Sequence, residues 1–183
     1  MARLRRVESS RKPHTCGTRE GPHPIPVGEG YYYWQPRYGP RHVRCFKHRP
    51  RQSEMTTSKM AEVYAAQEDL QEFNIVVLQE LEEEQSDADR LKVGKERAEE
   101  VLEDAMNRAQ EVADEYEAAI EAMPASEGQN REYIDQIEAW IQELEQHKDQ
   151  ANEVELGDDP DALENATNEL VEIVHNAAET LEA

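Results

Sequence analysis

Both cysteines of this chain and four of its six histidines lie between His14 and His48. Structural zinc sites are tetrahedral and use cysteine thiolates and histidine imidazoles as ligands. Cys45 and His48, with two residues between them, form a suitable ligand pair. Cys16 has no second cysteine nearby, so its partner is expected to be His23 or, as the alternative, His14. The spacing therefore indicates a zinc site formed by Cys16, His23, Cys45 and His48, and a metal-free remnant of such a site is the other interpretation.

The same stretch contains six of the eleven aromatic residues, interleaved with basic ones. Alternation along a strand sends Tyr31 and Tyr33 to one face and Tyr32 and Trp34 to the other. One interpretation is that one face packs a small core while the other shields the metal. A second is that bases of a nucleic acid stack on the rings while basic side chains neutralise phosphates. The candidate nucleic-acid residues are Tyr31, Tyr33, Trp34, Arg37, Arg41, Arg44 and Lys47.

Short elements rich in glycine and proline must position these ligands. Residues 31–34 and 42–46 have strand composition and are expected to pair as a β-hairpin, whereas prolines and glycines make residues 14–27 turn-rich. Residues 1–13 are expected to be a flexible basic arm. A head of this size and composition buries little core, so a bound metal would be needed to stabilise it.

The net charge of −21 hides a division of the chain near Ser53. Residues 1–54 contain twelve basic and four acidic residues, whereas residues 55–183 contain eight basic and thirty-seven acidic residues. Such asymmetry predicts two parts with different partners. We expect a head over residues 14–54 that contacts nucleic acid or an acidic surface. The acidic region over residues 55–183 is expected to bind a protein or to self-associate.

The acidic region has the periodicity of helices, which are expected near 58–85, 87–123, 127–155 and 160–182. In the second of these, apolar residues recur at spacings of three and four from Ala98 to Met123, where Pro124 ends the helix. The predicted fold class is mainly α, with a small zinc-ribbon-like β-hairpin head before an acidic antiparallel coiled coil or helical bundle. An extended rod that oligomerises through the same apolar stripes is the alternative. His147 and His175 are expected to face solvent.

The order of motifs brings two resemblances. Residues 14–70, and above all the segments around Arg44-Cys45 and from Ser58 to Glu68, resemble a family of uncharacterised bacteriophage and prophage proteins that join a short cysteine-containing head to an acidic helical tail. The head also resembles the poly(ADP-ribose) polymerase-type zinc finger, in the order of Ile25 to Glu29 followed by Cys45. It departs from that pattern because the second cysteine of the first ligand pair is absent. Neither resemblance implies an activity for this chain.

The function that these features favour is binding rather than catalysis. The sequence has no nucleophile–base motif, phosphate-binding glycine loop or catalytic metal pattern, so we expect no enzyme. It also has neither an apolar run long enough for a membrane span nor a secretory signal, so a cytoplasmic protein is expected, in the host cytoplasm if it is encoded by a phage. Two alternatives are a structural or scaffolding coiled-coil protein whose head docks on its own tail, and an acidic DNA mimic that binds a basic host protein.

Overall fold

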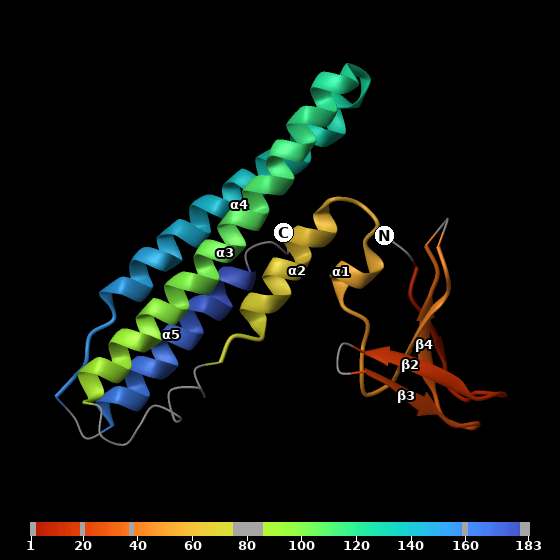
Figure 1. The fold of residues 1–183 in the computed structure, drawn as a ribbon, viewed down its shortest axis with the longest axis horizontal. Coiled ribbons are helices and arrows are strands. Elements are labelled where there is room, and N and C mark those ends of the chain that lie inside the picture. The colour runs from red at the N-terminus through yellow and green to blue at the C-terminus, as the bar shows by residue number, and fades with distance from the viewer. Residues whose placement is uncertain (1–2, 19–20, 37–38, 75–85, 159–160, 180–183) are drawn as a thin grey trace. The chain divides into compact units, whose positions relative to one another are not determined.

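The structure is a computed structural model that describes residues 3–18, 21–36, 39–74, 86–158 and 161–179 (Figure 1). The chain divides into two compact units, Met1–Tyr64 and Ala65–Ala183. Strands lie in the first unit and long helices in the second, which confirms the predicted fold class of a mainly α chain with a small antiparallel-strand head. The unit boundary falls inside helix α2 (Met60–Gln71), beyond the change of charge near Ser53.

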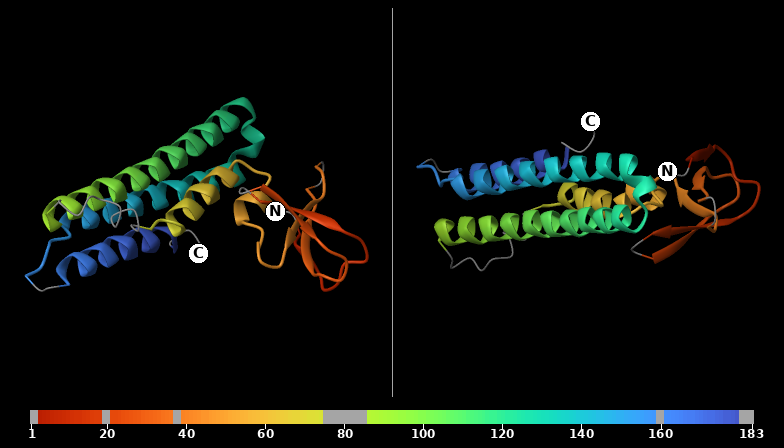
Figure 2. Two further views of the ribbon diagram at one scale, coloured as in Figure 1. Left: turned by 60° about the horizontal axis from the view of Figure 1, so that its bottom comes forward. Right: turned by 90° about the horizontal axis from the view of Figure 1, so that it is seen from above.

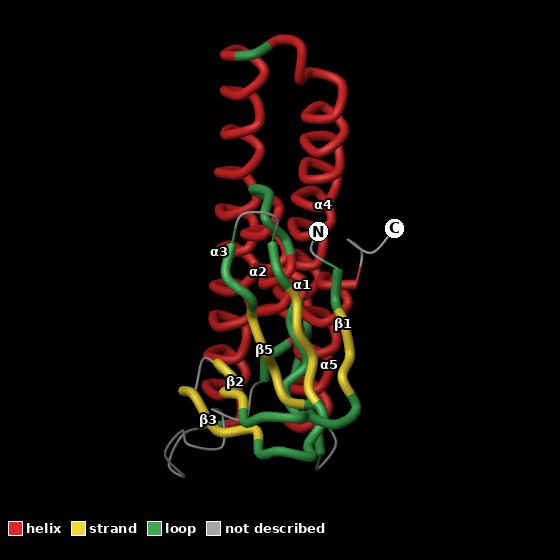
Figure 3. Tube along the Cα trace, turned by 90° about the vertical axis from the view of Figure 1, so that its right-hand side faces the viewer, coloured by secondary structure: helices red, strands yellow, loops and turns green. Residues whose placement is uncertain are grey.

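The first unit contains two small antiparallel sheets, whose strands are yellow in Figure 3. Strands β1 (Arg5–Val7), β4 (Tyr31–Trp34) and β5 (His42–Cys45) form one sheet in the order β1-β4-β5, and strands β2 (His14–Thr18) and β3 (Gly21–Ile25) form the other. The pairing of β4 with β5 confirms the expected hairpin. A short helix, α1 (Gln52–Met55), follows the sheets.

Two expectations for the head were wrong. Residues 5–7 belong to the sheet, with Arg5 opposite Tyr33 and Val7 opposite Tyr31, so this part of the N-terminal segment is not a flexible arm. Residues 14–25 are not only turns but include the β2–β3 hairpin. Proline is compatible with β3 because each strand of a two-stranded sheet has a free edge, where no partner requires an N–H group.

The core of the first unit surrounds the two cysteines. Cys16, Ile25, Tyr31 and Cys45 are buried together, and three partly buried side chains pack against them, namely Val7, Tyr33 and Val43. The rings of Tyr31 and Tyr33 therefore belong to the small core that one of the two interpretations assigned to one face of this strand. Burying both thiols within so small a core places them where a metal can hold several strands together.

The second unit consists mainly of long helices. Helix α3 (Asp87–Ala122) leads through the short 3-10 helix η2 (Pro124–Ser126) into α4 (Glu127–Glu153), and α5 (Ala162–Glu179) follows. The helices expected at 87–123 and 127–155 are confirmed, as is most of the helix expected at 160–182, of which residues 160 and 180–182 lie outside the described residues. The helix expected at 58–85 is wrong in extent, since α2 ends at Gln71, and residues 75–85 lie outside the described part.

Helices α3 and α4 run antiparallel as a long hairpin, and α5 lies along the half of this hairpin away from η2 (Figures 1 and 2). The apolar stripe of α3 is buried from Leu91 to Tyr116, but Met123, expected to continue it, is 60% exposed. Trp140 and Leu170 show that α4 and α5 bury their stripes too. The apolar stripes are thus covered within one chain, as in a bundle rather than an extended rod. No helix in the described ranges has the length and apolarity needed to cross a membrane.

Polar side chains join the helix ends of the second unit. Gln67 of α2 is buried and donates a hydrogen bond to the backbone carbonyl of Ala178 in the last turn of α5. Trp140 of α4 donates from Nε1 to the preceding carbonyl, that of Ala177, at 2.9 Å. Carbonyl groups in the last turn of a helix have no partner within the helix, so these two side chains satisfy acceptors that would otherwise be unpaired.

The histidines of the second unit were expected to face solvent, and this was wrong. His175 of α5 is half-buried, and its Nε2 atom lies 2.9 Å from the backbone carbonyl oxygen of Phe73, just beyond the end of α2. His147 of α4 is half-buried as well. For His175 the expectation failed because a residue distant in sequence contacts its side chain, and the acidic neighbours along the chain do not reveal that contact.

Candidate metal centre

Four side chains from different elements converge at the edge of the head's core. Cys16 lies on β2 and His23 on β3, while Cys45 ends β5 and His48 follows it in a tight turn. Cys16 and His23 are direct cross-strand partners in the β2–β3 hairpin. The six residues that separate them in sequence are therefore no obstacle, because the hairpin places both side chains on the same face.

The ligand atoms of the four side chains lie close to one another. One sulfur or nitrogen atom from each of Cys16, His23, Cys45 and His48 lies within 4.8 Å of the other three. The Sγ atom of Cys45 lies 3.3 Å from Nε2 of His23 and 3.2 Å from Nδ1 of His48, and the Cys16 Sγ atom lies 3.8 Å from that same Nδ1 atom. Metal bonds of about 2.3 Å to sulfur and about 2.0 Å to nitrogen separate such ligands by about 3.5 Å in a tetrahedron. These four residues lie close enough together to bind a metal.

The turn from Cys45 to His48 is fixed by its backbone and by one aromatic ring. The N–H of His48 donates to the carbonyl of Cys45 at 3.1 Å, which brings the two ligands to the same side. The ring of Phe46 packs over Gly30, where a β-carbon would lie 2.2 Å from ring atom Cε2 and 2.9 Å from the backbone oxygen of Glu8. Glycine is therefore required sterically at position 30 if Phe46 keeps its position.

Backbone and charge around the thiols favour a metal-bound thiolate. The N–H of Cys45 donates to Sγ of Cys16 at 3.3 Å, an interaction that supports a negatively charged sulfur. Without a metal, burial raises the pKa of the Cys16 thiol, and the adjacent Cys45 thiol raises it further, whereas that hydrogen bond and Arg44 act in the opposite direction. A cation bound between the sulfurs would reverse this balance, because a coordinating thiol loses its proton.

The structure selects His23 rather than His14 as the partner of Cys16. The ring of His14 packs against Tyr31, with 4.5 Å between ring centroids, and His14 does not belong to the group of converging ligand atoms. Burial, together with Lys12 and Arg41, lowers the pKa of His14. The ring of His42 stacks on Trp34 with 5.1 Å between centroids, and His42 also lies outside the group of converging ligand atoms.

Three of the candidate nucleic-acid residues do not form an open stacking platform. Tyr31 is buried in the core, and Trp34 is 2% exposed, with its Nε1 donating to the backbone carbonyl of Glu54 at 3.1 Å. Arg44 is half-buried and forms an ion pair with the Glu54 carboxylate. These positions disfavour the predicted stacking or phosphate contact, which stays a prediction for the three side chains. For Trp34 and Arg44 the effect is tertiary, because helix α1 supplies Glu54.

The remaining candidates lie at separate places in the head. Arg37 lies outside the described residues, and exposed Lys47 lines a hollow beside the metal ligands. Tyr33 and Arg41 meet at a second hollow, where the guanidinium carbon of Arg41 lies 3.7 Å from the Tyr33 ring centroid. Arg3 and Arg5 also border this hollow, although both lie in the segment that was expected to be a flexible arm. The alternation of arginine with leucine before Val7 is compatible with a strand, but such a short segment carries little information.

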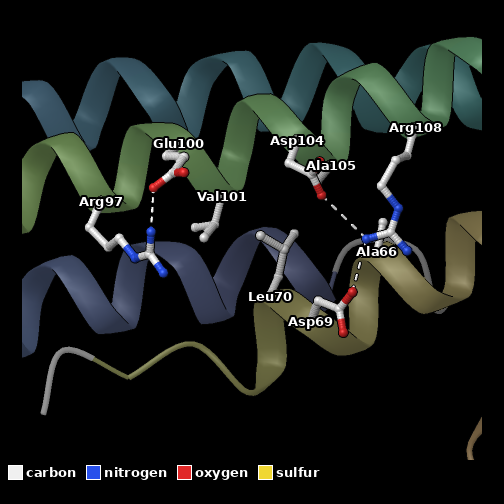
Figure 4. Close-up of a pocket in the computed structure, with 9 residues that line it drawn as sticks. All are labelled: Ala66, Asp69, Leu70, Arg97, Glu100, Val101, Asp104, Ala105 and Arg108. Carbon is white, nitrogen blue, oxygen red and sulfur yellow. Dashed lines mark hydrogen bonds and ion pairs between the residues drawn. The ribbon is translucent and has the colours of Figure 1, made fainter. Parts of the chain in front are cut away.

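A groove in the second unit, between α2 and α3, has a different character (Figure 4). Its charged side chains pair with one another: Arg97 binds Glu100, and Arg108 bridges Asp69 of α2 at 2.9 Å and Asp104 of its own helix at 3.3 Å. Leu70, Val101 and two alanines add apolar surface. Of these ion pairs, the one between Arg108 and Asp69 joins the two acidic helices.

Comparisons with known proteins add no relative to this description. No family model, no curated protein and no solved structure matches the chain. The functional inferences below therefore depend on the side chains and their geometry alone.

Proposed function

We propose that residues 14–48 form a structural zinc site with Cys16, His23, Cys45 and His48 as its ligands. Two thiolates and two imidazoles at tetrahedral spacing are the ligand set that zinc prefers in small domains. The observation that carries this proposal is the convergence of one ligand atom from each of these residues within 4.8 Å. A structural role is favoured over a catalytic one because four protein ligands complete the tetrahedron and leave no coordination position for a substrate.

The test is the metal content of the full-length chain purified without added metal. Elemental analysis should find one zinc per chain, and Cys45→Ser should remove it. His42→Gln is the matched control, since this histidine stacks on Trp34 outside the ligand group. A wild-type chain that holds no zinc, and that takes up none when zinc is added at micromolar concentration, would exclude this role.

We further propose that the chain is a non-enzymatic binding protein whose basic head contacts nucleic acid. Residues 1–54 contain twelve basic and four acidic residues, and three arginines of the described head border one hollow. A compact positive surface attracts the phosphate backbone through release of counterions, so binding should weaken steeply with salt. The acidic helical region would then contact protein, since its exposed surface repels nucleic acid.

This binding role is tested with the full-length zinc-loaded chain and labelled oligonucleotides. Single-stranded and double-stranded DNA are titrated over a series of salt concentrations, and the logarithm of affinity is plotted against that of salt. A negative slope for at least one of them supports the proposal. Affinity that is absent at low salt for both would exclude nucleic acid as the partner. The resemblance of residues 14–70 to bacteriophage proteins remains a prediction, and the result of this titration does not depend on it.

A further inference from the structure

We propose that the hollow around the Tyr33 ring is a binding site for single-stranded nucleic acid, an inference that rests on the proposed nucleic-acid role of the head. The hollow measures about 480 Å³ and is lined by Arg3, Arg5, Tyr33, Gln35, Pro36 and Arg41. In this site the arginines bind phosphates, and the Arg41–Tyr33 pair supplies a flat surface for one base.

The charge of the hollow favours an anionic ligand. Among the described residues, its lining contains three arginines and no carboxylate. The described acidic residues of the head are engaged elsewhere: Glu8 pairs with Arg6, Glu54 pairs with Arg44, and Glu29 lines the other hollow of the head. Positive charge in a concave surface, without neighbouring acidic groups, concentrates anions such as phosphates.

The Arg41–Tyr33 pair is held in place before any ligand binds. Arg41 lies over the Tyr33 ring at 3.7 Å and donates from Nη2 to the hydroxyl of Tyr31 at 3.2 Å. Arg5 donates from Nη1 to the hydroxyl of Tyr33 at 3.4 Å, and the side chain of Arg41 remains exposed. A guanidinium already fixed on a ring loses little conformational freedom on binding, so its outer face is ready to stack on a base.

This arrangement favours single strands over duplexes. Within a duplex both faces of each internal base are covered by neighbouring bases, so only phosphates can reach the hollow. In a single strand an unpaired base can leave its neighbours and stack on a protein plane, at about 1–3 kcal/mol per base by alanine substitution. A single strand can therefore make both phosphate and stacking contacts in this site, whereas a duplex can make phosphate contacts alone.

Two other concave surfaces of the described chain lack these features. The hollow beside the metal ligands carries one lysine, Lys47, together with Glu29, so its formal charges cancel. The groove of Figure 4 contains two arginines and three acidic residues, which pair with one another. Neither combines unopposed positive charge with an accessible flat surface.

The experiment uses the full-length zinc-loaded chain, a fluorescent oligothymidylate and an abasic oligomer of the same length. Arg5→Ala and Arg41→Ala should each weaken binding of oligothymidylate about tenfold and make the negative slope of log affinity against log salt shallower by about 0.7. Arg41→Lys keeps the charge but not the flat guanidinium, so it should retain the slope and still lose about fivefold in affinity. Arg11→Ala, an exposed arginine outside the hollow, should change affinity less than about twofold.

The outcomes distinguish the proposed site around Tyr33 from the general nucleic-acid role of the head. Wild-type affinity in both Arg5→Ala and Arg41→Ala, with one zinc retained per chain, would overturn the site and leave the nucleic-acid role intact. Equal wild-type affinity for oligothymidylate and the abasic oligomer would overturn the stacking contact. No salt-dependent binding by the wild type would overturn both the role and the site. Weaker binding in Arg41→Lys confined to the oligomer with bases is the result that supports the site most directly.

Discussion

Cys16 and His23 face each other across the β2–β3 hairpin, and this register is what completes the candidate metal centre. Their separation in sequence matches no common zinc motif, but antiparallel pairing makes the distance between them independent of that separation. Cys45 and His48 meet through a tight turn instead. One ligand pair thus comes from tertiary pairing and the other from local backbone geometry.

Replacing His23 should separate the true ligand from its alternative. His23→Gln removes one of four ligands. Because the four ligands share the total free energy of zinc binding, this loss should weaken zinc binding by about 100-fold. His14→Gln should leave zinc affinity within about threefold of the wild-type value, because the His14 ring packs on Tyr31 and lies outside the group of converging ligand atoms. Competition with a zinc-binding dye measures both. Loss of affinity in His14→Gln alone would assign the ligand set differently.

Zinc affinity should increase with pH from mildly acidic conditions to above pH 9. Burial raises the pKa of Cys16 above its ordinary value of 9.0, so the metal-free thiol is protonated at neutral pH. Zinc must displace that proton, which makes affinity rise about tenfold per pH unit for each proton released. Calorimetry in buffers of different ionisation enthalpy counts the protons. Binding without proton release at pH 7 would contradict the raised pKa.

Chelation of the metal should unfold the head but not the helical bundle. The two compact units each contain one tryptophan, Trp34 in the first and Trp140 in the second. In the variant Trp140→Phe, a strong chelator should shift the emission of Trp34 toward that of a solvent-exposed indole. In Trp34→Phe, emission should stay unchanged, and far-ultraviolet circular dichroism should retain its helical signal. Simultaneous loss of both signals would mean that the two units unfold as one.

Substitution of Gly30 should disturb the turn that carries His48. A β-carbon at this position lies 2.2 Å from Phe46 Cε2, so Gly30→Ala should destabilise the head by about 1–3 kcal/mol. Adding Phe46→Ala should recover part of this loss, since the backbone oxygen of Glu8 at 2.9 Å remains in the way. Thermal unfolding followed through Trp34 emission gives the coupling free energy between positions 30 and 46. Additive effects of the two substitutions would show that the ring does not restrict position 30.

Removal of the Gln67 amide should destabilise the helical bundle. Gln67→Leu leaves the carbonyl of Ala178 without this donor, which should lower the free energy of unfolding by about 1–3 kcal/mol. Gln71→Leu, the same change on an exposed face of the same helix, should alter stability by less than about 0.5 kcal/mol. Urea denaturation followed by circular dichroism compares them. Equal stability of the two variants would contradict a structural role for this hydrogen bond.

The residue types alone predicted much of this protein. Helix bounds in the second unit followed from apolar periodicity and from Pro124, because an amphipathic stripe must be buried wherever the helix packs. The β4–β5 hairpin followed from strand composition, and the candidate metal ligands, with His14 left as the alternative to His23, followed from the preference of zinc for thiolate and imidazole. These features depend on local chemistry, which the sequence states directly.

The remaining features were decided by the pairing of elements that lie far apart in sequence. The choice of His23 over His14 required the register of the β2–β3 hairpin, and the burial of Trp34 required Glu54 from a later helix. The place of Arg5 beside Tyr33 likewise required strand β1 to pair across the sheet. Contacts between residues far apart in sequence depend on how whole elements pack, and no local pattern of side chains encodes them.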